Sequence, residues 1–285
     1  MLQEENLGNG LIIYLKEQKR FIGIEIDMDN NRSNVIILVT GFKEREPWNS
    51  NWKECERTWV PLVRKLGYDV KISFGDPTID DYFLDEGNHI HFKASTGLDG
   101  VLDKRLKLPI KWILEHTNYD YYFCIDSDCF VHPERFDKML TENIKNHNPD
   151  YMGCKIPVTG LNTSIKQTFY EPIDYESDVN YYASGSAYMI SRKIMPIVLP
   201  KLWPFENQKF TKEKQLEIDD WVLGKVVKLE NIQLLNDTAI SIESPQRPSI
   251  MNPLGIPIPY IGDKDSFLAI QHYTDGLMDE IILSL

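Results

Sequence analysis

The chain has 285 residues, of which 42% are hydrophobic and 11% aromatic, and its 43 acidic and 31 basic residues give a formal net charge of -12. This length and apolar content are enough to bury a core, and they exclude a disordered chain. The negative balance argues against nucleic acid as a partner, because binding to a phosphate backbone needs clustered Lys and Arg. An anionic ligand would be repelled unless a divalent cation were held where it docks.

No run approaches the roughly 18 apolar residues of a membrane span, and the acidic, polar N-terminus lacks the pattern of a signal peptide. The four cysteines are scattered, without a C-x-x-C pair or the spacing of a zinc site. We therefore expect free thiols, a cytoplasmic protein and no integral membrane segment.

The first elements are extended. Two short apolar runs, 11–15 and 21–26, flank a charged turn and predict a β-hairpin, so that residues 1–34 form an N-terminal extension. The continuous apolar run 35–39 predicts a strand that is buried on both faces, as in a parallel sheet.

Helices and strands then alternate. One helical pattern ends at Gly67, and a second has apolar residues three and four apart. A short apolar run follows each of them. This alternation predicts the α/β class, with a Rossmann-like, mostly parallel central sheet flanked by helices. In chain order we expect a helix over 52–66, strands over 69–74 and 89–92, a helix over 99–116 and a strand over 121–125.

Two aspartates, Asp126 and Asp128, directly follow the last of these strands. In open α/β sheets, ligands bind beyond the carboxyl ends of the strands. Two carboxylates with one residue between them can share one side of an extended chain. They then offer Mg²⁺ or Mn²⁺ the hard oxygen ligands that these ions prefer. A D-x-D pair alone is a weak signal, because acidic pairs in loops are mostly just solvated. Its position after a buried strand, where charge is costly, favours a ligand-binding role.

The aspartates belong to a longer pattern, with W-I-L-E-H at 112–116 and Y-D-Y-Y-F-C-I-D-S-D-C-F-V-H-P at 119–133. These segments resemble W-V-L-E-H and Y-x-x-K-x-D-D-D-V-F-V-x-P of the β-1,3-glycosyltransferases, the family of the β-1,3-galactosyltransferases and Fringe. Three more blocks keep the family's order: R-T-W at 57–59, Y-A-S-G-S-A-Y-M-I-S at 182–191 and D-D-W-V-L-G at 219–224.

The resemblance implies a GT-A fold and an inverting glycosyltransferase. It implies a UDP-sugar as donor, a hydroxyl of a carbohydrate as acceptor, and Mn²⁺ or Mg²⁺ as cofactor. We accordingly expect one catalytic domain over 35–285, with a nucleotide-binding half over about 35–140 and an acceptor half over about 141–285 that contains a smaller β region.

The resemblance also implies roles for the aspartates. Asp128 matches a direct metal ligand, and Asp126 matches the residue that faces the metal-bound diphosphate and the ribose. Asp220 matches the catalytic base, which accepts the proton of the attacking hydroxyl, and Asp219 would orient the site or bind the acceptor. The alternative for Asp219 and Asp220 is a solvated pair at a helix start, where Asp stabilises the helix dipole.

Further residues follow from the same comparison. Ser184 and Gly185 lie where the family's backbone approaches the donor sugar. Lys104 resembles a family lysine on the diphosphate side, with Arg105 as the alternative because the alignment is uncertain by one residue. His272 lies where the family places a histidine metal ligand, although a single histidine after an apolar run is otherwise often a packed core residue.

Two other functions compete with the inverting transferase. One is a retaining transferase or related nucleotidyl-sugar enzyme on the same fold, in which Asp220 is not a base. The other is a catalytically inactive sugar-binding module. Intact Asp126, Asp128 and Asp220 argue against the inactive module.

Overall fold

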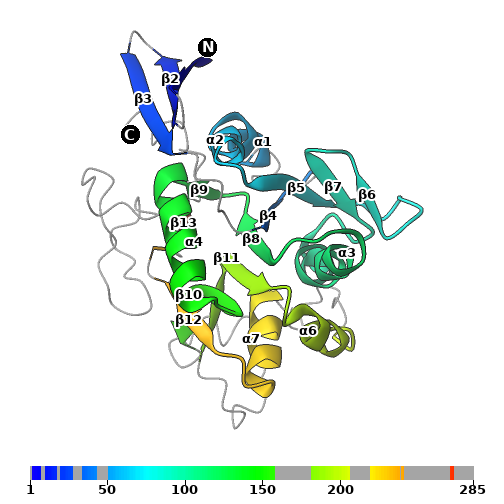
Figure 1. Ribbon diagram of the computed structural model, residues 1–285. Helices are drawn as coiled ribbons and strands as arrows, with labels where there is room; N and C mark the ends of the chain where they lie inside the picture. The colour runs from blue at the N-terminus through cyan, green and yellow to red at the C-terminus, as the bar shows by residue number, and fades with distance from the viewer. Residues whose placement is uncertain are drawn as a thin grey trace, which may run out of the picture.

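A computed structural model describes residues 2–7, 10–17, 20–27, 34–43, 51–157, 181–205, 219–237, 239–240 and 270–272 (Figure 1). It confirms the predicted α/β class and the mostly parallel sheet, since four of the seven neighbouring strand pairs in its eight-stranded sheet are parallel. The sheet order is β12-β10-β11-β8-β4-β5-β7-β6. In chain order its strands are β4 (Val35–Thr40), β5 (Asp69–Gly75), β6 (Phe83–Asp85), β7 (His89–Phe92), β8 (Tyr121–Asp126), β10 (Tyr151–Pro157), β11 (Tyr181–Ser191) and β12 (Leu234–Asn236).

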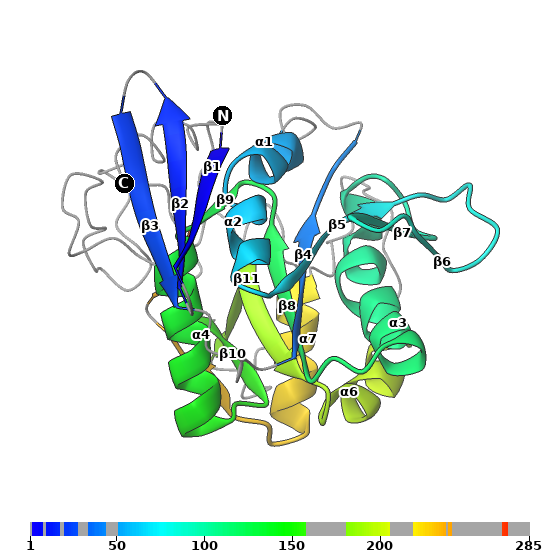
Figure 2. The ribbon, with the colours of Figure 1, turned by 45° about the horizontal axis from the view of Figure 1, so that its top comes forward.

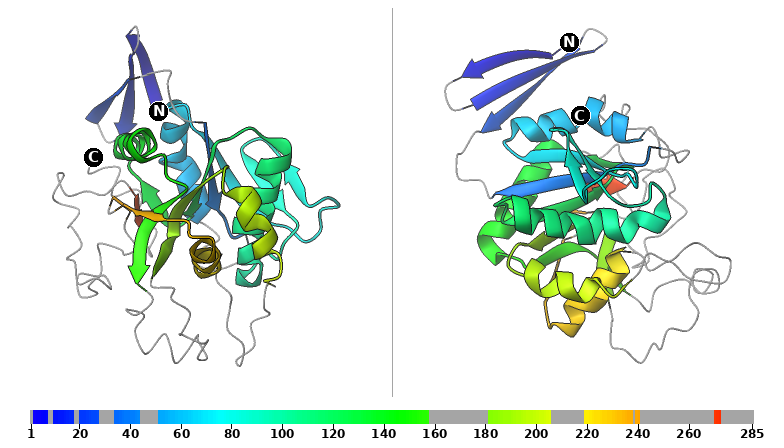
Figure 3. Two further views of the ribbon diagram at one scale, coloured as in Figure 1. Left: turned by 60° about the horizontal axis from the view of Figure 1, so that its bottom comes forward. Right: turned by 90° about the vertical axis from the view of Figure 1, so that its right-hand side faces the viewer.

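Helices cover both faces of this sheet, with α2 and α4 on one side and α3, α6 and α7 on the other (Figures 2 and 3). The central strand β4 is buried along its whole length. Val35, Ile37 and Val39 face the first helix layer, and Ile36 and Leu38 face the second, as the two-residue repeat of a strand requires. The helices are α1 (Asn51–Arg57), α2 (Val60–Lys65), α3 (Leu108–His116), α4 (Pro133–His147), α6 (Met195–Leu202) and α7 (Asp219–Leu229).

The helix predicted over 52–66 is two helices, α1 and α2, separated at Thr58 and Trp59. Pro61 lies in the first turn of α2, where a helix does not need its N–H group. Because Pro61 has no N–H, it cannot donate the helical hydrogen bond to the carbonyl of Arg57, four residues earlier. The chain therefore starts a new helix. The expected end at Gly67 is confirmed, with a φ of 90° at the glycine.

The helix predicted over 99–116 begins with a short 3₁₀ turn, η1 (Leu98–Gly100), and contains a π turn, η2 (Asp103–Lys107). The Leu108 amide donates to the carbonyl of Asp103, five residues earlier. Pro109 has no N–H for the carbonyl of Arg105, and that carbonyl instead accepts a hydrogen bond of 2.6 Å from the hydroxyl of the buried Tyr122. A proline at this position thus accounts for the wider turn.

Two smaller sheets complete the described structure. The predicted N-terminal hairpin is present as β2 (Gly10–Glu17) and β3 (Arg20–Asp27), and β1 (Leu2–Leu7) adds a third strand that the sequence did not indicate. Short strands β9 (Cys129–Val131) and β13 (Ile270–His272) pair in antiparallel fashion beyond the end of β8. None of the described helices is long and apolar enough to cross a bilayer.

Candidate active site

Asp126 and Asp128 lie at the carboxyl end of the sheet, as predicted for a ligand site. Asp126 is the last residue of β8 and pairs with Thr40, the last residue of the parallel strand β4. Ser127 and Asp128 form the turn into β9. The Asp126 side chain is 26% exposed, and Asp128 is 8% exposed.

Two side chains of α1 and the α1–α2 junction hold this turn. The Cys55 thiol donates to the carbonyl of Ser127 at 3.1 Å, and the Trp59 indole N–H donates to the carbonyl of Cys129 at 3.1 Å. Both Cys55 and Trp59 are fully buried. Because the two bonds flank Asp128, they fix the backbone on which its carboxylate is presented.

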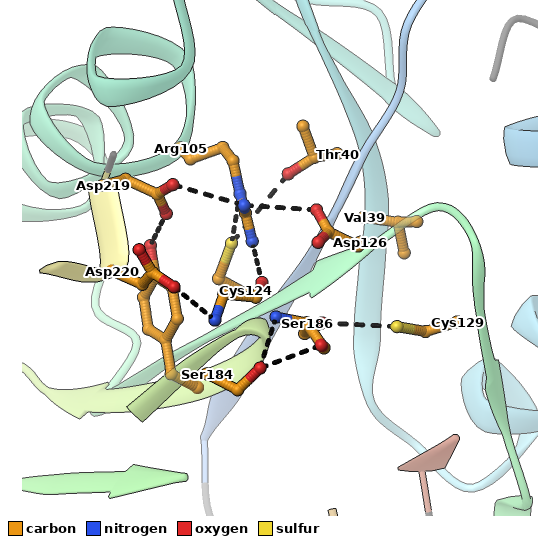
Figure 4. A network of polar contacts seen from close by, with 12 residues as sticks. Val39, Thr40, Arg105, Cys124, Asp126, Cys129, Ser184, Ser186, Asp219 and Asp220 are labelled. Atoms are coloured by element: carbon orange, nitrogen blue, oxygen red, sulfur yellow. Dashed lines mark hydrogen bonds and ion pairs between the residues drawn. The ribbon is translucent and has the colours of Figure 1, made fainter. Parts of the chain in front are cut away.

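A buried arginine links the aspartates that lie far apart in sequence (Figure 4). Nη1 of Arg105 lies 3.2 Å from Oδ1 of Asp126 and 3.3 Å from Oδ1 of Asp219. Its Nη2 donates to the carbonyl of Gly185 in β11. Burial alone would lower the pKa of Arg105, but Asp126 and Asp219 outweigh it and raise the pKa well above the ordinary value. The guanidinium therefore stays charged and joins β8, β11 and α7.

Asp219 and Asp220 begin α7 but are not solvated, which removes the alternative of an exposed pair at a helix start. Asp219 is fully buried and accepts a hydrogen bond of 2.9 Å from the Tyr188 hydroxyl in addition to its contact with Arg105. Asp220 is 9% exposed and accepts from the backbone amides of Gly185 at 2.9 Å and Trp221 at 2.7 Å.

The two aspartates differ in their electrostatic environment. Burial first, and the negative charge of Asp219 second, raise the pKa of Asp220 to about 7, while Arg105 and the amide of Gly185 act in the opposite direction. Asp219 is held by the Arg105 guanidinium and the Tyr188 hydroxyl. Asp220 is therefore able to exchange a proton near neutral pH.

Gly185 is a position of close backbone approach. A β-carbon built there would lie 2.9 Å from Oδ2 of Asp220 and 3.6 Å from Nη1 of Arg105. The sequence predicted such an approach toward a donor sugar, and the structure shows it toward Asp220. The neighbouring Ser184 is 4% exposed, and its hydroxyl lies 2.9 Å from that of Ser186.

Of the two basic residues that the alignment left open, Arg105 reaches the aspartates. The Lys104 ammonium lies 3.1 Å from the carbonyls of Thr96 and Gly97 and 3.8 Å from the centroid of the Phe42 ring. Lys104 is fully buried, and its ammonium group holds the segment before η2.

His272 approaches the site through its backbone. In the β9–β13 pair, His272 lies opposite Cys129, the residue after Asp128. The side chain of His272 lies outside the part of the chain that the structure describes. Among the side chains that are described, no three His, Cys, Asp or Glu come together as a metal site. Asp126 and Asp128 offer oxygen donors of the type that fits Mn²⁺ or Mg²⁺.

Sequence reasoning did not assign roles to Cys55, Trp59, Tyr122 or Tyr188. A signal for the first two was present: Cys55 and Trp59 are four residues apart within the segment 52–66 predicted as one helix, and this spacing predicts that they share one side of it. Tyr122 and Tyr188 lie within predicted strand segments, and only the pairing of β8 with β11 reveals that Tyr188 points toward α7.

The Galactosyltransferase family model matches residues 103–238. This segment comprises 136 of the 285 residues and contains Arg105, Asp126, Asp128, Gly185 and the Asp219–Asp220 pair, but not His272. No curated protein matches the chain.

Solved glycosyltransferases show distant likenesses. One, involved in glycosylation of the major capsid of PBCV-1, is 11% identical, covers 88% of this chain and 99% of its own, and has a TM-score of 0.42. A mannosyltransferase from Pyrobaculum calidifontis, in complex with GDP-Man and Mn²⁺, is 9% identical over 74% of this chain and 57% of its own, with a TM-score of 0.38. GlyE of Streptococcus pneumoniae TIGR4 is 11% identical over 89% and 61%, with a TM-score of 0.43. At these identities and TM-scores the likenesses are too distant to assign a ligand.

Proposed function

Because the Galactosyltransferase family model matches residues 103–238, which include the aspartates of the site, we propose that the chain is an inverting, metal-dependent hexosyltransferase that moves a sugar from a UDP-sugar to a hydroxyl of a carbohydrate acceptor. The observation that carries this proposal is the arrangement of Asp220. It is a largely buried carboxylate with a raised pKa, placed across Arg105 from the Asp126-Ser127-Asp128 turn.

In this reaction Asp220 is the base. Its ionised carboxylate accepts the proton of the acceptor hydroxyl while that oxygen bonds to the anomeric carbon of the donor. The bond from the anomeric carbon to the diphosphate oxygen breaks on the opposite side, and the nucleoside diphosphate leaves with the electron pair. A base with a pKa near 7 suits this step at neutral pH, because it is both available and able to hold the proton.

Asp128, Asp126 and His272 are the residues that would hold the metal ion. A bound Mn²⁺ or Mg²⁺ would neutralise the negative charge on the diphosphate. The protein's part is to hold the carboxylates in place, which Cys55 and Trp59 do for the Asp128 turn.

Arg105 and Asp219 position the base rather than react. Arg105 fixes the Gly185 carbonyl and Asp219, and Gly185 in turn donates its amide to Asp220. The charge of Asp219 helps to keep the pKa of Asp220 near neutrality. In this pair of adjacent aspartates, Asp219 therefore positions the site and Asp220 accepts the proton.

Thermal unfolding with a panel of nucleotides, with and without Mn²⁺, tests the donor. We expect stabilisation that needs both UDP and metal, worth about 2.7 kcal/mol at 100 times the Kd, and its removal by EDTA. A shift with another nucleotide, or with UDP in EDTA, would reject the UDP–metal assignment.

Asp220→Asn tests the base. We expect UDP binding to persist while transfer falls by about 100-fold to 10,000-fold. Asp150→Asn is the matched control, because Asp150 is a carboxylate remote from the site that pairs with Lys193. Substantial transfer by Asp220→Asn would move the base elsewhere and favour a retaining enzyme.

A further inference from the structure

Aromatic and lysine side chains gather where α6 ends and α7 begins. We call this set the aromatic–lysine face: Trp203, Phe205, Trp221, Lys107 and Lys225. Trp203 is 55% exposed, whereas Phe205 and Trp221 are half-buried against the hydrophobic core below α6 and α7. Helices α3, α6 and α7 lie on one side of the sheet (Figure 3), so the face is formed by neighbouring elements.

The ammonium groups of Lys107 and Lys225 lie near the aromatic rings of this face. The Lys107 ammonium lies 5.8 Å from the centroid of the Trp203 ring and donates to the carbonyl of Phe205. The Lys225 ammonium lies 5.6 Å from the Phe205 ring and 5.4 Å from the Trp221 ring. Lys107 also pairs with Asp103 at 3.3 Å. Among the described residues, Lys225 contacts these two rings and has no carboxylate partner.

The face shares two elements with the site. Lys107 follows Arg105 by two residues in the π turn η2, and Trp221 directly follows Asp220 at the start of α7. The aromatic–lysine face therefore shares η2 and the first turn of α7 with Arg105 and the proposed base, and it includes Trp203 at the end of α6. A molecule that presents a hydroxyl to Asp220 has this face next to it.

Core packing does not account for Trp203. Phe205 and Trp221 pack against the buried cluster of α3, α6 and α7, but Trp203 does not belong to it. An exposed indole beside half-buried rings and an amine is a typical ligand contact, because it buries a large apolar area on binding at a small entropic cost. Rings of this kind pack against the apolar C–H faces of sugars, and an ammonium donates hydrogen bonds to sugar hydroxyls.

We infer that the aromatic–lysine face is a second acceptor subsite, which binds the sugar unit next to the one that receives the transferred sugar. This rests on the proposed function, since it assumes a carbohydrate acceptor at Asp220. The acceptor class is then an oligosaccharide or glycoconjugate rather than a free monosaccharide. Its second sugar contacts Trp203 and Trp221, and Lys225 donates to its hydroxyls.

Saccharide binding without a donor tests this inference separately from catalysis. The chain has six tryptophans, each with one indole N–H signal in a ¹⁵N-labelled sample, and Trp→Phe variants assign them. Lactose, cellobiose and chitobiose are titrated beside galactose, glucose and N-acetylglucosamine. We expect at least one disaccharide to shift the Trp203 and Trp221 signals and to bind more tightly than its monosaccharides.

Variants then locate the contact. Trp203→Ala should weaken disaccharide binding about tenfold, Trp203→Phe should restore most of it, and Lys225→Ala should weaken it to a smaller extent. Leu229→Ala and Lys228→Ala are matched controls, because both residues are exposed at the far end of α7. Disaccharide binding that Trp203→Ala leaves unchanged, or no shift of the Trp203 signal by any of these sugars, overturns the subsite.

The two proposals fail in different ways. Disaccharide binding at Trp203 without UDP-dependent transfer would keep the subsite and reject the proposed reaction. Transfer to a saccharide that leaves the Trp203 signal unmoved would keep the reaction and reject the subsite.

Discussion

The amide of Gly185 donates a hydrogen bond of 2.9 Å to Oδ2 of Asp220, and a β-carbon at residue 185 would lie 2.9 Å from the same oxygen. The contact that orients the proposed base thus requires a residue without a side chain. Strand β11 supplies the amide, and the first turn of α7 supplies the carboxylate.

We therefore predict that Gly185→Ala displaces Asp220. A displacement of the base by about 1 Å is enough to lower kcat by about 100-fold. Steady-state kinetics check this, and the UDP-dependent thermal shift of the variant serves as the control for an intact donor site. A Gly185→Ala enzyme with the kcat of the wild type would contradict the proposed role of the Gly185–Asp220 contact.

Arg105→Met should destabilise the fold strongly. It leaves the fully buried Asp219 without its cation, and breaking a buried ion pair costs about 3–5 kcal/mol. Urea unfolding measures the difference. Lys111→Met is the control on the same helix, since Lys111 contacts only the face of the Tyr82 ring, at 4.0 Å, among the contacts described. Equal stability of the two variants would show that the buried network contributes little.

Asp220→Asn should change how stability depends on pH. The pKa of Asp220 is about 7 in the folded chain against an ordinary value of 3.8, so the folded state holds this proton more tightly than the unfolded state does. The associated stability is present at low pH and is lost as the pH rises through 7. Between pH 5.5 and 8.5 the wild type should lose about 2 kcal/mol through this group.

Unfolding in urea at the two pH values measures this loss. Asp220→Asn should abolish it, because an amide does not titrate, and Asp150→Asn should retain it. An unchanged pH dependence in Asp220→Asn would exclude Asp220 as the titrating group.

Trp59→Phe should loosen the Asp126-Ser127-Asp128 turn. The substitution leaves the carbonyl of Cys129 without its buried donor, which costs about 1–3 kcal/mol. Residues that orient metal ligands affect metal affinity about 10-fold to 100-fold. We expect weaker Mn²⁺-dependent UDP binding by calorimetry. Trp112→Phe, in a buried tryptophan on the other face of the sheet, should leave that affinity unchanged.

Much of the architecture could be predicted from the sequence, because buried parallel strands are continuous apolar runs. Strand β4 and the position of Asp126 at the end of β8 both follow from this pattern. The interruption at Thr58 and Trp59 could not be read from the apolar spacing of 52–66, since the spacing persists through it. Pro61 was the available signal.

Regular helical spacing could not show whether Lys104 or Arg105 reaches the aspartates of the site. A regular α-helix turns about 100° per residue, and the π turn at 103–107 adds a residue to that count. The side chains before and after it therefore do not keep one periodic face. Only the proline four residues after Arg105 pointed to the irregularity.

The π turn also makes the site sensitive to chain length. It holds one residue more than an α-helical path across the same span would need, and that extra residue keeps both Arg105 beside Asp219 and Trp112 in the core. A deletion of Asp103 would let the helix relax to regular geometry and rotate Arg105 out of the network without altering any residue that contacts it. In this chain, insertions and deletions between Leu102 and Pro109 should be as damaging as substitutions at Arg105 itself.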